Sequence, residues 1–518
     1  MPNIRTVTEL FEQSVRLYPD NIAVSDGIGS ITYKEMASQV TLLANGLSRF
    51  GIRKGDRVVI CLPNWHEMAI IYFALAKIGA MLVPCNVKYR EEEISRIVQN
   101  SGAKAVFIME EHHHLDIMNK IGRQRIQHIF SVRFIGDDVT SLEELMEIGQ
   151  EAEPPSDVIQ SEDVFTIIYT SGSTGQPKGA ELTHRNVLHV AISTASNLGA
   201  TCRDVFYVPV PATHVFGLVA GMLTAISVGA KILFLPKYHP IKALELIEKE
   251  KVTIHLGVPT TFKLELNSLS DHHFDLSSLR TGIIAGAPCP AEIVRRVRTE
   301  MNCNVAISYG TTETSAGISF TRFEDSEILR TETVGKAVDG ADIKVVNDEG
   351  IEVGRGEIGE VVCRGAGVMK GYYNSPSITK ECLDQDGWFH TGDLGTMDNE
   401  GYIRIVGRKK EVINCGGFKI YPPEIENLFY KHPAVLEVAV FGMPDQVLGE
   451  VPCAAISLKE EYAKDEEIMK DFIKEKIAKY KVPKRIVFMD DFPKTESGKI
   501  KKRELIQILA DREEATRV

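Results

Sequence analysis

Hydrophobic positions follow two spacings along the first 320 residues. Segments with helical spacing alternate with short apolar runs at 57–61, 105–108 and 231–235. Because this alternation is typical of parallel strands covered by helices, it predicts α/β layers. Two longer apolar stretches, 68–85 and 216–236, each hold a lysine and a glycine before a short strand-like run. We therefore expect each to form a buried helix, a turn and a buried strand rather than a membrane span.

The pattern changes after about residue 330. Short β-rich pieces separated by glycine continue to residue 407 and predict a small antiparallel sheet or barrel. Strand and helix patterns then resume and end in a tail rich in lysine and glutamate. The charged run 408–411 is the sharpest candidate for a domain boundary. We therefore expect one unit over residues 1–407 and a second over residues 408–518.

The composition is that of a packed globular protein, with 44% of the 518 residues hydrophobic and 25% charged. The net charge of −12 has the wrong sign for a protein that binds nucleic acid over its whole surface. Any phosphate group must therefore bind at a confined site with its own donors and cations. Nine scattered cysteines without a C-x-x-C spacing argue against a disulfide framework or a zinc site. The N-terminal segment has helical spacing and lacks the apolar core of a signal peptide, which predicts a cytoplasmic protein without a transmembrane segment.

The strongest local signal for chemistry is the segment 169–179, which reads YTSGSTGQPKG and follows an apolar run. Its glycines, its hydroxyl side chains and Lys178 offer backbone N–H groups, hydroxyls and a cation to phosphate oxygens. The segment is not a Walker P-loop, because Pro177 stands where the second glycine belongs. The alternative of an ordinary surface turn explains only a few of these residues. A second glycine pattern at 354–359 precedes a strand rather than a helix, so we interpret it as a turn.

Five motifs together resemble a known family. The loop YTSGSTGQPKG is followed by YGTTE at 309–313, TGD at 391–393, GRKKEVINCGGFKIYPPEIE from 407 and PKTESGK at 493–499. This order is similar to that of the adenylate-forming superfamily, which contains acyl-CoA synthetases, 4-coumarate:CoA ligases, luciferases and the adenylation domains of peptide synthetases. The pattern is closest to fatty acyl-CoA synthetases.

The resemblance implies a fold as well. It places an AMP-binding and acyl-binding domain at 1–407, with two helix-covered, mostly parallel sheets and a small β-barrel. A smaller, mobile α+β domain at 408–518 would carry the hinge and the catalytic lysine. By position, the hinge is Lys410.

The resemblance assigns roles at the nucleotide. The phosphates would be held by Thr170, Ser171, Gly172, Ser173, Thr174, Gly175 and Lys178. The adenine pocket would be formed by Gly286, Ala287 and Pro288 with Tyr309, Gly310 and Thr311, where Tyr309 stacks on the base. In the same picture Thr312 contacts the α-phosphate, Glu313 binds Mg²⁺, and Asp393 and Arg408 contact the ribose.

Lys499 is the first candidate for catalysis. Composition alone favours a solvated basic tail around this residue. The resemblance instead implies that Lys499 stabilises the charge of in-line displacement at the α-phosphate, with coenzyme A arriving later past Gly417, where the absence of a Cβ lets its arm approach the backbone. A non-catalytic relative would have lost Lys499 or Glu313, and both are present.

The substrate is the weakest part of the prediction. His214 resembles a histidine at the mouth of the acyl pocket, which implies a catalytic role in gating or in orienting the carboxylate, with a structural histidine as the alternative. Val215 stands where amino-acid-activating relatives place an aspartate. No charged residue lies between 209 and 225, and Glu313 alone is charged between 308 and 320. A pocket made of these stretches favours an acid with an apolar tail. A medium- or long-chain fatty acid and an aryl carboxylate both fit.

We therefore expect an acid–thiol ligase that converts an acid, ATP and CoA to acyl-CoA, AMP and pyrophosphate, with Mg²⁺ as cofactor. The alternatives are an aryl-CoA ligase of the 4-coumarate or benzoate type, an enzyme that loads an acyl carrier protein, and a luciferase-type oxidation. A nucleic-acid partner is not expected. A homodimer stays open.

Overall fold

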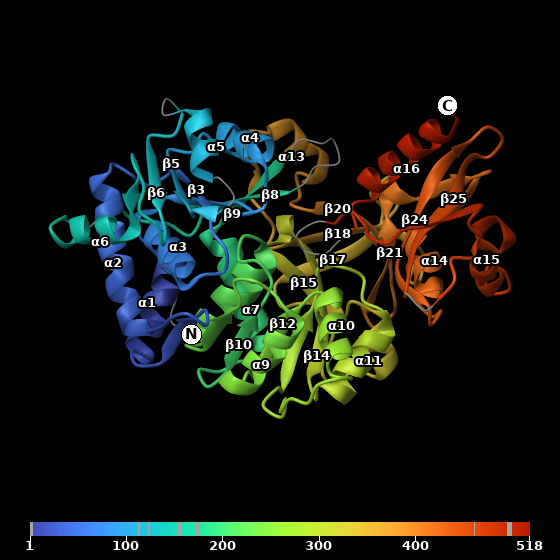
Figure 1. Ribbon diagram of the computed structural model, residues 1–518, viewed down its shortest axis with the longest axis horizontal. Coiled ribbons are helices and arrows are strands. Elements are labelled where there is room, and N and C mark those ends of the chain that lie inside the picture. The colour runs from blue at the N-terminus through green and yellow to red at the C-terminus, as the bar shows by residue number, and fades with distance from the viewer. Residues whose placement is uncertain are drawn as a thin grey trace.

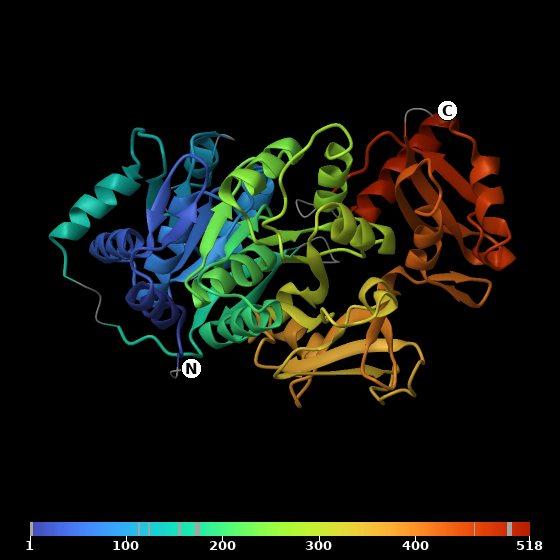
Figure 2. The same cartoon turned by 90° about the horizontal axis from the view of Figure 1, so that it is seen from below.

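The computed structural model describes residues 4–111, 114–122, 125–153, 157–170, 177–459, 462–494 and 500–517. The predicted α/β class is confirmed, with a large N-terminal domain and a small C-terminal domain beside it at one end of the long axis (Figure 1; Figure 2). Among the described residues, no helix is long and apolar enough to cross a membrane.

One large sheet has eight strands and is mostly parallel, with antiparallel pairs at β8–β9 and β9–β19. Its strands, in spatial order, are β19 (Gly371–Tyr372), β9 (Lys178–Thr183), β8 (Val164–Thr170), β4 (Met81–Pro84), β3 (Arg57–Cys61), β5 (Ala105–Ile108), β6 (His128–Ser131) and β7 (Thr140–Ser141).

The other large sheet has nine strands, and its central strands are also parallel. Its strands, in spatial order, are β16 (Lys336–Ala337), β15 (Ala316–Phe320), β14 (Asn304–Thr311), β13 (Thr281–Ile284), β12 (Ile254–Gly257), β10 (Val205–Val208), β11 (Lys231–Phe234), β1 (Ile22–Ser25) and β2 (Ser30–Thr32).

Helices separate and cover the two sheets. The shared core between the sheets contains side chains from α1 (Val7–Leu17), α2 (Tyr33–Arg49), α3 (His66–Ile78), α7 (His184–Leu198), the π-helix η2 (Phe216–Leu223) and α8 (Thr224–Ser227), with α6 (Leu142–Gln150) against α2. The outer face of the eight-stranded sheet packs against α4 (Glu91–Ser101) and α5 (His114–Ile121). The outer face of the nine-stranded sheet packs against α9 (Pro240–Glu250), α10 (Pro259–Ser268) and α11 (Ala291–Glu300), and α12 (Glu327–Glu332) contacts α11.

The two long apolar stretches form buried helix, turn and strand, as predicted. In the first stretch α3 is buried on nearly all sides and ends at Gly79, whose φ of 70° is left-handed, before β4 begins. In the second stretch η2 and α8 precede β11, and every residue of η2 is buried. π-Helices are rare in proteins, and those that occur often lie at functional sites. The sequence pattern did not indicate a π-helix here.

The β-rich segment after residue 330 forms a four-stranded antiparallel sheet with β17 and β21 at its edges. Its strands are β17 (Ala341–Val346), β18 (Gly359–Gly365), β20 (Phe389–Met397) and β21 (Ile403–Arg408), and α13 (Pro376–Cys382) contacts β20. The predicted domain boundary at 407–408 falls at the end of β21, and the short helix η4 (Lys409–Glu411) follows.

The small domain has a core of its own. Its five-stranded sheet is formed by β22 (Ile413–Cys415), β23 (Phe418–Ile420), β24 (Val435–Asp445), β25 (Gly449–Leu458) and β26 (Arg485–Phe488). The helical elements around the sheet are α14 (Pro422–Phe429), α15 (Glu466–Lys474), η5 (Lys479–Lys481) and α16 (Lys502–Arg517).

Candidate active site

Tyr309, Asp393 and Arg408 meet although they come from separate segments of the chain. The Tyr309 hydroxyl donates to Asp393 Oδ2 at 2.7 Å, and Arg408 Nε lies 2.9 Å from Asp393 Oδ1. Burial and the neighbouring Asp393 carboxylate hold the pKa of Tyr309 well above its ordinary value, so its hydroxyl stays protonated and donates. Strand pairing brings Asp393 on β20 beside its register partner Arg408 on β21, and Tyr309 reaches Asp393 from β14 in another sheet.

A second cluster surrounds Glu313. The Tyr372 hydroxyl donates to Glu313 Oε1 at 2.6 Å, and Lys178 Nζ lies 5.5 Å from the centroid of the Tyr372 ring. Burial and the Glu313 carboxylate raise the pKa of Tyr372, which keeps its hydroxyl as the donor. The backbone N–H of Met369 donates to the Glu313 carbonyl at 2.8 Å and holds the segment in place.

Glu313 fits its predicted role as an Mg²⁺ ligand. Mg²⁺ prefers oxygen ligands and is bound through one or two carboxylates together with substrate phosphates. The Tyr372 hydroxyl occupies one carboxylate oxygen of Glu313, and the other accepts no hydrogen bond from the residues that the structure describes. Tyr372 is a site residue that sequence reasoning missed, because nothing in its local sequence indicates a contact across 59 residues.

The predicted phosphate loop lies between two strands of one hairpin. Thr170 ends β8, Lys178 begins β9, and the two are register partners. The predicted residues Ser171, Gly172, Ser173, Thr174 and Gly175 lie outside the described residues, as does Lys499. The described flanks of the Lys499 motif, Lys494 and Ile500, form an antiparallel bridge.

The YGTTE segment is the end of β14 and the 3₁₀ helix η3 (Thr312–Thr314). A Cβ at Gly310 would lie 1.6 Å from the Ala316 carbonyl oxygen, so the hairpin requires glycine there. The Thr311 hydroxyl is buried and has no hydrogen-bond partner among the residues that the structure describes, and Thr312 is buried beside it. Because a buried hydroxyl without a partner is costly, Thr311 Oγ1 is a suitable contact for a bound nucleotide.

Three further predicted positions lie near strand ends of the large domain. Gly286, Ala287 and Pro288 follow β13, the strand beside β14. Gly286 has a left-handed φ of 88°.

His214 lies between β10 and η2, and its Nδ1 accepts the backbone N–H of Phe216 at 3.3 Å. A neutral His214 therefore carries its proton on Nε2, where it can donate.

The predicted hinge and the pantetheine glycine lie beyond β21. Lys410 lies in η4, and burial together with Arg408 lowers the pKa of its ammonium. Gly417 has a left-handed φ of 88°, and a Cβ there would meet open space. It belongs to the turn between β22 and β23, and no hydrogen bond or ion pair within the described part of the chain joins it to the Asp393 or Glu313 clusters.

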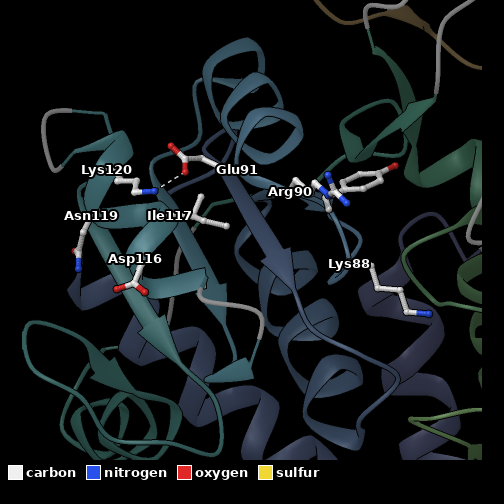
Figure 3. A pocket seen from close by; sticks show the side chains of 8 residues that line it. Lys88, Arg90, Glu91, Asp116, Ile117, Asn119 and Lys120 are labelled. Carbon is white, nitrogen blue, oxygen red and sulfur yellow. Dashed lines mark hydrogen bonds and ion pairs between the residues drawn. The ribbon is translucent and has the colours of Figure 1, made fainter. Parts of the chain in front are cut away.

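A separate surface hollow of about 770 Å³ lies next to α4 and α5. In Figure 3, Lys120 is joined to Glu91 across one side of the hollow, and Lys88 and Arg90 lie on the other side. None of the residues predicted for the site lines this hollow.

Comparisons with known proteins identify the family. A model of the AMP-binding enzyme family matches residues 11–373, and a model of the AMP-binding enzyme C-terminal domain matches residues 424–499. The chain belongs to the AMP-binding enzyme family. This confirms the resemblance to the adenylate-forming superfamily and places the chain close to the acyl-CoA synthetases.

One curated relative is the medium-chain fatty-acid–CoA ligase of Escherichia coli, which is 33% identical over 96% of this chain and 89% of that protein. Among solved structures, the anthranilate CoA ligase AuaEII in complex with anthranoyl-AMP has a TM-score of 0.89 at 28% identity and covers 99% of both chains. The o-succinylbenzoate CoA synthetase MenE of Bacillus subtilis, in complex with ATP and a magnesium ion, has a TM-score of 0.83 at 29% identity and covers 96% of this chain and 98% of that chain.

Proposed function

We propose that this AMP-binding enzyme is an ATP-dependent carboxylate–CoA ligase that works through an acyl-adenylate. In the first step a carboxylate oxygen attacks the α-phosphorus of ATP, and pyrophosphate leaves. In the second step the CoA thiol attacks the acyl carbonyl, loses its proton, and AMP leaves. The observation that carries this proposal is the joining of Tyr309, Asp393 and Arg408, which supplies a carboxylate and a cation suited to ribose hydroxyls.

The rate of the first step depends on positioning and on charge stabilisation at phosphorus. Asp393 would accept hydrogen bonds from the ribose, Tyr309 would cover the adenine, and Thr312 would contact the α-phosphate. Lys178 would contact the outer phosphates from β9. Glu313 would hold Mg²⁺, which when bound offsets triphosphate charge. We assign the α-phosphate cation to Lys499 from the motif alone.

We propose a medium-chain fatty acid as the substrate. The E. coli relative is named for such acids. The apolar, fully buried helix η2 follows His214, and Gly310 pairs with Gly317 on β15, so no side chain fills that position. Buried apolar residues such as those of η2 favour an alkyl tail over a charged one. The apolar crevice beside Gly317 has a volume of only about 10 Å³, so it does not hold the tail.

An aryl acid is the second candidate. The structural similarity to AuaEII, which was solved with anthranoyl-AMP, favours it. For either acid we propose that the chain divides into two domains at 407–408 and that Lys410 is the hinge between them. We also propose free CoA, rather than a carrier protein, as the acceptor of the acyl group.

The test is nucleotide product analysis with ATP, Mg²⁺ and acids from acetate to palmitate, with benzoate and coumarate added. AMP and pyrophosphate that turn over only with CoA support the ligase, and the best acid identifies the tail. Stoichiometric acyl-AMP that is unaffected by CoA indicates a carrier protein as acceptor. ADP as the product contradicts the proposal.

A further inference from the structure

Helix α10 of the large domain is anchored by a buried hydrogen bond. His255 Nε2 on β12 lies 2.7 Å from Glu265 Oε2 on α10, and both side chains have no exposed surface. The Tyr238 hydroxyl adds contacts to Glu265 Oε1 at 3.3 Å and to the Thr261 carbonyl at 3.1 Å. An anchored helix of this kind is a rigid support for anything that its other face holds.

The other face of α10 contacts the small domain through Lys263. Two residues along a helix are about 200° apart, so Lys263 and Glu265 point in nearly opposite directions. Lys263 Nζ donates to the Leu436 carbonyl on β24 at 2.7 Å and lies 5.9 Å from the centroid of the Tyr430 ring. Burial lowers the pKa of the Lys263 ammonium, which shows that this contact is partly shielded from water.

The contact continues to the base of the Lys499 motif. Glu437, the residue after Leu436, forms an ion pair with Lys494 at 2.7 Å. Lys494 in turn bridges Ile500, and the Lys501 backbone N–H donates to the Pro493 carbonyl at 2.8 Å. Lys494 and Ile500 flank residues 495–499. The large domain therefore holds both flanks of the motif through β24, at a place separate from the linker after β21.

We infer that Lys263 is a positioning residue for acyl-adenylate formation, an inference that rests on the proposed function. Lys263 contacts no reacting group. It sets the small domain, and with it the base of the Lys499 motif, against the nucleotide site of the large domain. A misplacement of about 1 Å in a catalytic group lowers a rate by about a hundredfold. The second step breaks the anhydride at its carbonyl carbon and needs no cation at a departing pyrophosphate.

The experiment separates the two steps in the full-length protein. The Lys263→Met variant keeps the apolar stem and removes the donor and the charge. We expect the single-turnover rate of pyrophosphate release, measured with octanoate and ATP without CoA, to fall about ten- to hundredfold. The rate of octanoyl-CoA formation from supplied octanoyl-AMP and CoA should change by less than about twofold. Lys263→Arg retains a donor and should recover part of the first rate.

Two further variants test the connection that runs from Lys263 through Glu437 to Lys494. Glu437→Gln removes the ion pair with Lys494, so it should slow the same step, and its combination with Lys263→Met should be less than additive. Lys249→Met is the matched control, since Lys249 on α9 has a side chain that is 77% exposed. It should leave both steps at the wild-type rate.

Three results would overturn the inference: equal loss in both steps, no loss in either step, or a fall in thermal stability that accounts for the loss. Failure of the proposed function is distinguishable, because it shows in the wild-type protein. If the wild type releases no AMP or pyrophosphate with any acid of the panel, the ligase assignment fails first and the inference fails with it.

Discussion

At the scale of single residues, the site depends on carboxylates whose oxygens are already oriented by neighbours. Asp393 is 5% exposed and is contacted by a phenol on one oxygen and a guanidinium on the other. Hydrogen bonds to charged groups contribute more than neutral ones, so each partner limits how the carboxylate can turn. Glu313 and Tyr372 repeat this arrangement with a single donor.

Replacing Asp393 tests the proposed ribose contact. Asp393→Asn removes the charge that pairs with Arg408 and turns one acceptor into a donor that faces it. We expect kcat/KM for ATP to fall about ten- to hundredfold, because a hydrogen bond to a charged group contributes about 1.5–3 kcal/mol. Steady-state kinetics at varied ATP measure this. Asp386→Asn, at an exposed turn, is the control, and an unchanged ATP dependence in Asp393→Asn would contradict the assignment.

Replacing Tyr372 tests the proposed metal ligand. Tyr372→Phe removes the hydroxyl that orients Glu313. Because loss of a partner behind a metal ligand typically costs 10–100-fold in affinity, we expect the half-saturating Mg²⁺ concentration to rise about tenfold. The neighbouring Tyr373→Phe is the matched control, since that hydroxyl contacts the Ser101 carbonyl at 3.4 Å instead. An Mg²⁺ titration of pyrophosphate release distinguishes the two variants.

At the scale of elements, the β14–β15 hairpin brings two glycines together next to Tyr309. Gly310 and Gly317 are register partners, but they have different surroundings. A Cβ at Gly310 would meet a backbone carbonyl, whereas a Cβ at Gly317 would lie 2.3 Å from the Ser308 hydroxyl oxygen, which can rotate away by giving up its hydrogen bond to the Ser319 carbonyl. The hairpin backbone therefore tolerates a methyl group at one position better than at the other.

The two glycines give different predictions for stability. Gly310→Ala should lower the free energy of unfolding by about 1–3 kcal/mol and reduce activity with every acid, because the backbone must move. Gly317→Ala should lower it by less, about 1 kcal/mol, because the Ser308 side chain can move and only its hydrogen bond to the Ser319 carbonyl is lost. Denaturant unfolding of both variants measures the difference. An equal loss of stability in the two variants would contradict this assignment.

At the scale of the whole molecule, a cluster of charges joins the two large sheets. Asp26 follows β1 of the nine-stranded sheet, and Arg133 follows β6 of the eight-stranded sheet. Arg133 lies 2.6 Å from Asp26 and 2.7 Å from Glu67, and His66 lies 3.0 Å from Asp26. The carboxylates of Asp26 and Glu67 and the imidazole of His66 have the spacing of a metal site. The Arg133 guanidinium already supplies the positive charge that a metal ion would bring.

This cluster predicts a pH-dependent contribution to stability. Burial alone would raise the pKa of Asp26, but hydrogen bonds from His66, from the backbone and from Arg133 outweigh it and lower the pKa well below its ordinary value. The contribution is therefore present above the unfolded-state pKa of about 4 and is lost as the pH falls below it.

Arg133→Met leaves Asp26 buried without its cation and should lower the free energy of unfolding by about 3–5 kcal/mol at pH 7, with a smaller difference at acidic pH. Thermal unfolding of both proteins between pH 7 and pH 3 measures this difference. Arg96→Met, which removes an exposed pair with Glu92 on α4, is the control and should change stability by less than about 1 kcal/mol. A pH-independent difference for Arg133→Met would contradict the assignment to Asp26.

The sequence by itself determined the α/β layers, the buried stretches around α3 and η2, and the family. These features are local: apolar spacing decides helix or strand, and the five motifs are short strings in a fixed order. The same strings contain Glu313, Asp393 and Arg408, and the resemblance assigned each of them a role in the site.

Tertiary structure alone decided which of these residues touch and what supports them. The Tyr372 hydroxyl reaches Glu313 across 59 residues, and Lys263 reaches Leu436 across 173. Neither contact has a local signal, because strand pairing and the packing of two domains set the distance between residues that are remote in sequence. The π-helix also escaped prediction, since an apolar run has the same composition in an α-helix and in a π-helix. The residues proposed to bind and to react could therefore be named from the sequence, whereas Tyr372 and Lys263, which we propose position them, could not.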